Sequence, residues 1–220
     1  MKDSPKNNPV QNLHTELFRK YGKPEGQWSL WCRRPKTEAE KEEIFIEAIL
    51  TQRTNWKNVE LAMNNLRAEN ITRLNDICGS CEKDIAKFAT FIKPAGFYSQ
   101  KAGYLQNLAK FVLENYKTVS QMQKEPPAKL REELLALRGI GPETADSIML
   151  YALEKPVFVI DEYTKRLARA KSITDDFSYP ALQNLFEKSI ARDYEFYQDF
   201  HALIVINGKE KNNGIFKQSQ

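Results

Sequence analysis

Apolar residues recur along most of the chain at the three- and four-residue spacing of an amphipathic helix. The clearest case follows Thr37-Glu-Ala-Glu40, a capping box in which threonine and glutamate side chains each satisfy an orphan backbone amide. It predicts a buried helix over residues 38–50. The same periodicity predicts further helices at residues 55–68, 81–92, 99–115, 127–136, 142–154, 161–170, 178–192 and 194–207. One β-like run, Val157–Ile160, is too short to anchor a sheet, so the pattern predicts an all-α protein.

Glycine and proline residues separate the predicted helices, at Gly79, Pro94–Gly96, Pro126–Pro127, Gly139–Gly141 and Pro156. Most linkers are short, which favours a compact bundle. Of the 220 residues, 41% are hydrophobic, enough to fill a core. No run of about 18 apolar residues could span a membrane, and the N-terminus lacks the apolar stretch of a secretory signal. We therefore expect a cytoplasmic protein without a membrane partner.

Positive charge is concentrated near the N-terminus. Residues 1–36 contain eight Lys and Arg against three acids, +5 in all, although the whole chain carries only +4. Such a segment suits a polyanionic partner, although we expect the first dozen residues to form a solvated tail.

Of the three cysteines, Cys32 stands alone, whereas Cys78 and Cys81 have the spacing of a redox or metal pair. No second pair accompanies them, so a structural role is expected for all three.

The segment LRGIGPETAD, Leu137–Asp146, joins two of the predicted helices. We expect Gly139 and Gly141 to take conformations that a side chain would disfavour, Ile140 to enter the core and Pro142 to begin the next helix. The loop amides would then face outward and bind a phosphate group independently of base sequence. The same glycines are equally consistent with an ordinary connection between two helices.

Asp161 follows the buried apolar run and precedes the predicted helix EYTKRLARA, so its simplest role is that of an N-cap. It also stands twenty residues after Gly141. The order of hairpin, helix, apolar run and aspartate resembles the helix-hairpin-helix DNA glycosylase superfamily, the endonuclease III relatives. The resemblance implies that Asp161 is catalytic, which is compatible with a capping role.

Three further motifs extend the resemblance over residues 37–208. Ile49–Gln52, followed by Thr54, resembles the segment whose glutamine enters the duplex beside the extruded nucleotide. Gly96–Ala102, GFYSQKA, resembles a "glycine, aromatic, x, x, Lys-Ala" segment, and Phe200–Gly208 resembles the closing helix. Four motifs in the family's order are specific, although each alone would be weak.

The family's fold would give this chain two helical subdomains with a cleft between them. A six-helix barrel containing the helix-hairpin-helix would be formed by residues 33–155, and the second subdomain by residues 1–32 and 156–220. The resemblance implies a monomeric glycosylase of base excision repair that acts on damaged double-stranded DNA. Its location would be the cytoplasm of a bacterium or archaeon, at the nucleoid.

The resemblance assigns DNA contacts to one group of residues: Gln52, Arg53, Lys101, Gly139, Ile140, Gly141 and Thr144. Such contacts imply an affinity that falls steeply with salt. The carbonyl oxygens of Leu137 and Gly139 could in addition hold a sodium or potassium ion. No other metal or cofactor is expected.

Glu143 departs from the pattern of bifunctional members, which carry a lysine two residues past the second glycine and cleave the strand. A carboxylate cannot form the Schiff base, and the helix dipole favours an acid in the first turn. We therefore expect a monofunctional enzyme without AP lyase activity. Asp161 would stabilise an oxocarbenium-like sugar or activate the water, and the sequence leaves both roles open.

Many relatives end in four cysteines that bind an iron–sulfur cluster. No cysteine follows Cys81 in this chain, so no cluster is expected.

The segments Leu50–Trp56 and Pro94–Tyr98, together with a glutamate at position 143, most resemble the 3-methyladenine DNA glycosylase branch of the MagIII type. This resemblance places Trp28, Trp31, Trp56 and Glu143 in the base pocket. An indole face favours a cationic base such as 3-methyladenine by roughly 0.5–2 kcal/mol. Trp28 and Trp31 are equally consistent with core positions.

Two alternatives remain open. A mismatch-specific uracil or thymine DNA glycosylase would need hydrogen-bond donors for a neutral pyrimidine, which Gln52, Arg53 or Asn55 could supply. A non-catalytic helix-hairpin-helix DNA-binding module would use Asp161 only as a cap.

Overall fold

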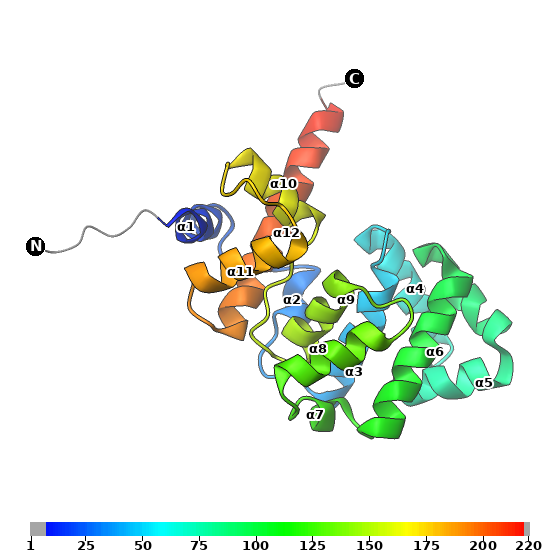
Figure 1. Ribbon diagram of the computed structural model, residues 1–220. Coiled ribbons are helices and arrows are strands. Elements are labelled where there is room, and N and C mark those ends of the chain that lie inside the picture. The colour runs from blue at the N-terminus through cyan, green and yellow to red at the C-terminus, as the bar shows by residue number, and fades with distance from the viewer. Residues whose placement is uncertain (1–7, 218–220) are drawn as a thin grey trace, which may run out of the picture. The chain divides into compact units, whose positions relative to one another are not determined.

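The structure, a computed structural model, describes residues 8–217, with side chains through Glu210. Over this range every regular element is helical and no strand is present, so the all-α prediction is confirmed (Figure 1). None of the described helices is both long and apolar enough to cross a membrane. In chain order the elements are α1 (Pro9–Tyr21), α2 (Trp28–Trp31), α3 (Glu38–Leu50), α4 (Trp56–Ala68), α5 (Leu74–Phe91), the 3-10 helix η1 (Lys93–Ala95), α6 (Tyr98–Asn115), α7 (Val119–Met122), α8 (Pro127–Ala136), α9 (Pro142–Ser147), the π-helix η2 (Ile148–Ala152), α10 (Glu162–Ala170), α11 (Tyr179–Ser189) and α12 (Tyr194–Lys217).

The chain divides into two compact units. One is formed by Arg33–Lys155, and the other combines the described residues up to Cys32 with those from Pro156 onward. In the Arg33–Lys155 unit, α3 lies at the centre and packs against α4, α6, α7, α9 and η2. The side chains of Ile44, Phe45 and Ile49 are completely buried there. The predicted capping box is present, since Glu40 N donates to Thr37 Oγ1 at 3.3 Å and Thr37 N to Glu40 Oε2 at 2.7 Å.

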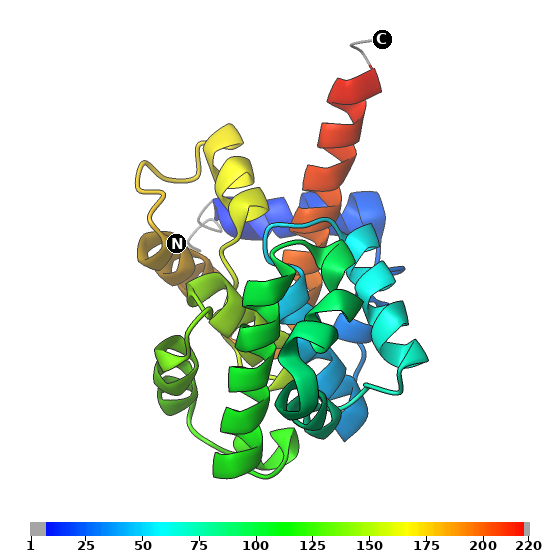
Figure 2. The same cartoon turned by 90° about the vertical axis from the view of Figure 1, so that its right-hand side faces the viewer.

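In the unit formed by both ends of the chain, α12 packs against α1 and α10 (Figure 2). Its core is a cluster of aromatic rings. The ring of Phe158 lies 4.7 Å from that of Phe186 and 5.5 Å from that of Phe200, measured between ring centroids. The apolar run Val157–Ile160 is therefore a buried extended segment that leads into α10 rather than part of a sheet.

The predicted start of a helix at residue 81, after a break at Gly79, is wrong. Helix α5 begins at Leu74 and continues through Gly79, and its kink lies at Asp84, where φ is −165° and ψ is 94°. Asp84 Oδ1 accepts a hydrogen bond from Lys87 N at 2.9 Å. The carboxylate thus caps the second half of α5, a local bond that ends one helical segment and starts the next.

The expected N-terminal tail is also wrong for residues 9–12, and residues 1–7 lie outside the described range. Asn8 Oδ1 accepts from Val10 N at 3.1 Å and caps α1, while Val10 and Leu13 are buried. The apolar face of α1 therefore provides enough burial to fix a helix in a polar segment. The other differences are in length and type: α12 extends past residue 207, α11 ends at Ser189, residues 148–152 of the predicted helix 142–154 are a π-helix, and the periodicity did not predict α2, α7 or η1.

Candidate active site and DNA-binding surface

Asp161 is the N-cap of α10, as its sequence position predicts. One carboxylate oxygen, Oδ1, accepts hydrogen bonds from Thr164 N at 2.7 Å and from Thr164 Oγ1 at 2.9 Å. The residue is only 9% exposed and Thr164 is fully buried. The second oxygen, Oδ2, lies 3.5 Å from His201 Nε2 on α12. The two oxygens of one carboxylate therefore have separate surroundings, a helix terminus and an imidazole.

The close approach of α10 to α12 brings this pair together. At Gly208 of α12, a Cβ atom would lie 2.2 Å from a ring carbon of Tyr163, so the glycine leaves room for that ring. Two of the predicted pocket tryptophans lie beside the pair. The rings of Trp28 and His201 meet edge-on with centroids 6.0 Å apart, and Trp31 meets Trp28 in the same way at 6.0 Å. Both indoles are 6% exposed.

The pKa of Asp161 is lowered although burial, the largest single influence, raises it. The hydrogen bond and positive charge of His201, together with the two hydrogen bonds from Thr164, favour the charged form and outweigh the loss of hydration. The carboxylate is therefore ionised in the neutral range, and its low basicity makes it a poor proton acceptor. This environment suits a group that stabilises positive charge.

Lys209 is a second ionisable group in the same unit. Its Nζ donates to Gln27 Oε1 at 2.7 Å. Burial lowers the pKa of Lys209, and the negative charge of Asp161 acts in the opposite direction. Lys209 is a half-buried amine on which the charge of the candidate catalytic carboxylate acts, so it bears on whether an amine takes part in the chemistry.

In the Arg33–Lys155 unit the hairpin between α8 and α9 follows the prediction at Gly139 but not at Gly141. Gly139 has φ +91°, and a Cβ there would lie 2.3 Å from a ring carbon of Tyr104. Gly141 has the extended values φ −92° and ψ 177° that any residue adopts, and a Cβ would meet nothing within 4 Å. Ile140 is 5% exposed and enters the core, as predicted. Pro142 begins α9.

Gln52 lies in the turn after α3 and is hydrogen-bonded to the hairpin. Its Nε2 donates to Gly139 O at 2.9 Å and to Thr144 Oγ1 at 3.1 Å. Thr144 is buried, so its hydroxyl is directed to Gln52 in this structure. Arg53, the next residue, is exposed and has φ +51°. The structure therefore brings four of the predicted DNA contacts together, with the glutamine amide held against the hairpin.

Lys101 has a different position from that of a DNA contact. It is 2% exposed, and its Nζ donates to Leu50 O and to Ala95 O, both at 2.8 Å. Leu50 ends α3 and Ala95 ends η1, so the ammonium group satisfies carbonyls that helix termini leave without partners. Burial lowers the pKa of Lys101 to about 8. The side chain joins two turns and does not present its charge to a ligand.

The remaining predicted pocket residues belong to the Arg33–Lys155 unit. Trp56, at the start of α4, is half-buried and donates from Nε1 to Glu60 Oε1 at 3.0 Å. Glu143 lies exposed in the first turn of α9, where the helix dipole favours a carboxylate. Asn55 Oδ1 accepts from Asn58 N at 3.0 Å and caps α4. The predicted pocket residues are thus divided between the two units, with Trp56 and Glu143 in one and Trp28 and Trp31 in the other.

Three candidate functional residues were missed by the sequence analysis. Thr164 lies three residues past the cap and could have been found from the capping pattern. His201 has no local signal, because only the packing of α12 on α10 brings it to Asp161. Phe97 is 56% exposed, has φ +48° and precedes α6, immediately after the turn that Lys101 holds through Ala95. Its signal in the sequence was its place directly after Gly96 in the segment GFYSQKA.

The carbonyl oxygens proposed for a monovalent cation already accept hydrogen bonds. Leu137 O accepts from Ile140 N at 3.1 Å and Gly139 O from Gln52 Nε2 at 2.9 Å. Each carbonyl retains a second lone pair that could face a sodium or potassium ion, and such an ion stays a prediction. No group of three or more His, Cys, Asp and Glu side chains within the described part of the chain is arranged to hold a metal ion.

A family model described as "HhH-GPD superfamily base excision DNA repair protein" matches residues 46–192. A protein of Methanocaldococcus jannaschii, named only provisionally as a DNA repair glycosylase, is 44% identical over 171 residues, which make up 76% of each chain.

Solved structures agree with the sequence matches. The 3-methyladenine DNA glycosylase MagIII of H. pylori, bound to 1,N6-ethenoadenine, has a TM-score of 0.74 at 29% identity over 92% of this chain and 96% of its own. A trapped covalent endonuclease III–DNA intermediate has a TM-score of 0.68 at 18% identity over 89% and 83%, a likeness of fold alone.

Proposed function

The chain belongs to the HhH-GPD superfamily of base excision DNA repair proteins, and on this premise we propose that it is a monofunctional DNA glycosylase that removes an alkylated purine, with 3-methyladenine the first candidate. The observation that carries the proposal is the Asp161 carboxylate. It is buried, its Oδ1 is fixed by Thr164, and its Oδ2 lies 3.5 Å from His201, whose ring meets that of Trp28 edge-on.

Asp161 would act mainly as an electrostatic stabiliser. When the bond between base and sugar breaks, positive charge develops on the sugar, and a fixed carboxylate in a dry site stabilises it more strongly than water does. The low pKa of Asp161 favours this role over proton abstraction. The carboxylate would hold the attacking water through a hydrogen bond while the cation forms.

The aromatic rings beside Asp161 support a purine that carries a positive charge. Trp28 and Trp31 belong to the same unit as the carboxylate, and a cationic base gains from contact with an indole; both side chains are 6% exposed, so only a small part of each ring is open to such contact. Such a base also leaves easily, so little acid catalysis is required. The ethenoadenine held by H. pylori MagIII is likewise a modified purine.

The neutral-pyrimidine alternative has less support. Of the three side chains expected to supply donors to such a base, Gln52 already donates to the hairpin. Asn55 caps α4 through its oxygen, so its Nδ2 and the guanidinium of Arg53 are the donors that could recognise uracil or thymine. A non-catalytic module leaves unexplained why a capping aspartate has a buried histidine at its second oxygen.

DNA would be bound by the hairpin and the turns joined to it. Gly141 is exposed with open space beside it, so the amides near it could bind a phosphate, and Arg53, the neighbour of Gln52 in the chain, is exposed as well. Phe97 offers an apolar ring of the kind that fills the space left in a duplex when a nucleotide is extruded.

Strand cleavage would require an amine that attacks the sugar carbon, and the proposal holds that none does. Glu143 occupies the position of the family's nucleophilic lysine. Lys209 is the described lysine that tests this part of the proposal, because its pKa is lowered and Asp161 acts on it electrostatically. Lys209 is hydrogen-bonded to Gln27, so we expect it not to attack the sugar. Borohydride should then trap no covalent complex with abasic DNA.

A panel of duplexes tests the proposal. The duplexes carry 3-methyladenine, 7-methylguanine, 1,N6-ethenoadenine, hypoxanthine, uracil opposite guanine, or thymine opposite guanine, and base release is measured with and without alkali. We expect release of alkylated purines and strand breaks only after alkali. Asp161→Asn should lower the rate about a hundredfold or more while duplex binding is retained.

Asp176→Asn is the matched control, because Asp176 also accepts a backbone hydrogen bond, from Ser178 N at 2.9 Å, but is exposed. It should excise normally. Unchanged excision by Asp161→Asn would reduce Asp161 to a cap. A preference for uracil or thymine would replace the alkylpurine assignment, and strand breaks without alkali would overturn the monofunctional one.

A further inference from the structure

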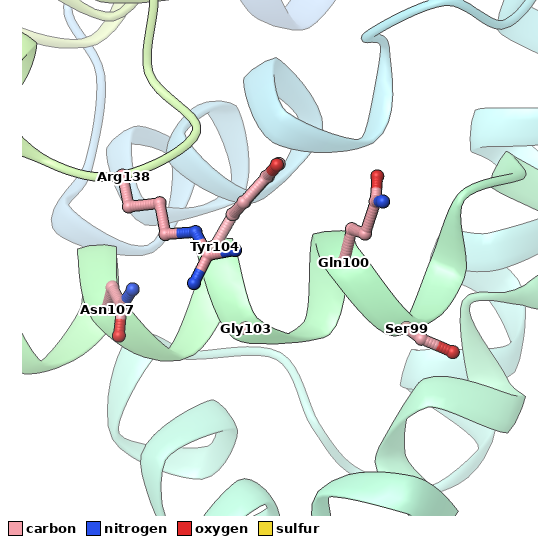
Figure 3. A pocket seen from close by; sticks show the side chains of 6 residues that line it. All are labelled: Ser99, Gln100, Gly103, Tyr104, Asn107 and Arg138. Carbon is pink, nitrogen blue, oxygen red and sulfur yellow. The ribbon is translucent and has the colours of Figure 1, made fainter.

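A polar pocket lies beside the hairpin, between it and α6. It has a volume of about 280 Å³ and is lined by Ser99, Gln100, Gly103, Tyr104, Asn107 and Arg138 (Figure 3). Five of these residues follow one another at intervals of one to four along α6, so they share one face of that helix. Arg138 comes from the hairpin, one residue before Gly139. None of the assigned DNA contacts lines this pocket.

Gly103 lines the pocket, and no neighbouring atom explains why this position is a glycine. It lies inside α6, where glycine costs roughly 0.5–1 kcal/mol relative to alanine. A Cβ at this position would meet nothing within 4 Å, whereas the nearby Gly139 is required by the ring of Tyr104. Neither a neighbouring atom nor a positive φ requires glycine at this helical position. Its missing side chain leaves the backbone open to a bound molecule.

Arg138 gives the pocket its charge. Its side chain extends from the hairpin over α6 toward Asn107 and Tyr104 (Figure 3). Arg138 is exposed and forms no ion pair with any carboxylate of the described residues. The remaining polar side chains of the wall carry two hydroxyls and two amides, which can donate to an anion without adding negative charge. The lining therefore suits a phosphate group.

We infer that this pocket binds a phosphodiester of the DNA backbone, as a second anchoring site beside the hairpin. Arg138 would supply the charged hydrogen bond and Asn107 and Gln100 would add neutral donors. The open backbone at Gly103 would allow the phosphate to lie against α6. The inference rests on the proposed DNA-binding function and adds a site whose loss weakens binding without affecting the chemistry at Asp161.

Two variants test the pocket from opposite sides. Gly103→Leu fills it and should also raise the denaturant midpoint, because leucine replaces glycine in a helix with free space around it. Arg138→Ala removes the charge. Binding is measured by fluorescence anisotropy on a labelled duplex with a non-cleavable abasic analogue, over a series of salt concentrations.

We expect each variant to bind about tenfold more weakly. For each, the slope of log affinity against log salt should become shallower by about 0.9, the value for one phosphate contact. Since both variants remove the same contact, the double variant should bind no more weakly than the weaker single one.

The controls separate this effect from general changes. Gly79→Leu makes the same exchange at an exposed site in α5 with nothing within 4 Å, and Arg67→Ala removes one exposed charge from α4. Both should bind as the wild type. Equal losses in these controls, or unchanged binding by Gly103→Leu and Arg138→Ala, would overturn the inference. If Gly103→Leu fails to fold, Arg138→Ala decides alone.

Replacing chloride with inorganic phosphate at equal ionic strength distinguishes the backbone from a free anion. Phosphate that competes with the duplex in the wild type but not in Arg138→Ala would show that the backbone uses this site. Unchanged duplex affinity in Arg138→Ala, with an effect of phosphate on the wild type that this variant loses, would make it a site for free anions and overturn the inference. Failure of the proposed function has a different signature, because the wild type itself would then neither bind the duplex nor release a base.

Discussion

At the scale of single residues, the two oxygens of Asp161 have separate surroundings, so the proposed catalytic role is compatible with its role as a cap. Oδ1 completes the first turn of α10 through Thr164, and Oδ2 lies beside His201, where the proposal places the developing charge of a substrate. The cap also holds the carboxylate in place, because breaking its hydrogen bonds would cost the helix roughly 0.5–2 kcal/mol. The candidate reactive group is thus part of the secondary structure that positions it.

His201→Gln should move the acid limb of the excision profile to higher pH. Glutamine retains a donor near Oδ2 but no positive charge, so the pKa of Asp161 rises and the carboxylate is lost at a higher pH than in the wild type. The measurement is the rate of base release between about pH 4 and 7. His14→Gln is the matched control, because the other histidine packs against the rings of Phe196 and Phe200. An unmoved limb would mean that His201 only packs.

At the scale of elements, the two hairpin glycines serve different purposes. Gly139 is needed for the fold, since its φ is positive and Tyr104 of α6 fills the space beside it. Gly141 has an ordinary conformation and open space beside it, so its missing side chain is not needed for the fold and keeps the loop backbone accessible. The hairpin is therefore fixed on one side by α6 and left accessible on the other.

Gly139→Ala should lower the free energy of unfolding by about 2 kcal/mol or more, from backbone strain and the clash with Tyr104. Gly141→Ala should cost no more than about 1 kcal/mol, the loss of a glycine N-cap, but should weaken DNA binding by crowding the amides. Denaturant unfolding and anisotropy measure the two effects. Equal destabilisation by both substitutions would contradict this division.

At the scale of the whole molecule, stability depends on the protonation of Lys101. Its pKa falls from 10.5 to about 8 on folding. Between these values the unfolded chain holds a proton that the folded chain has released, so the free energy of unfolding rises with pH. The full shift corresponds to roughly 3 kcal/mol.

Lys101→Met should abolish this rise between pH 8 and 10.5. Lys110→Met is the control, because that exposed lysine pairs with Glu82 and its pKa is raised instead. Urea unfolding at several pH values gives the comparison. The same slope in the wild type and in Lys101→Met would assign the pH dependence to other groups.

Local signals predicted the fold well where short-range bonds decide it. Helices α3 and α8 were predicted to the residue, because a capping box begins α3 and Pro126-Pro127 begins α8. Hydrophobic periodicity could not predict whether the break in α5 lies at Gly79 or at Asp84, because the cap formed by Asp84 decides it. The pairing of Asp161 with His201 and the different roles of the hairpin glycines depend on neighbours from distant elements, α12 and α6, so they required the structure.

A repair enzyme spends most of its time scanning undamaged DNA, where a side chain that entered at every base pair would stop its movement. Gln52 is held by Gly139 O and Thr144 Oγ1 in the free protein. If it enters the duplex, both hydrogen bonds must break, at a net cost of about 1 kcal/mol each. Entry is then favourable only where a base pair is already weakened, as damage weakens it. The two hydrogen bonds would then act as an energetic threshold that keeps the glutamine out of undamaged DNA.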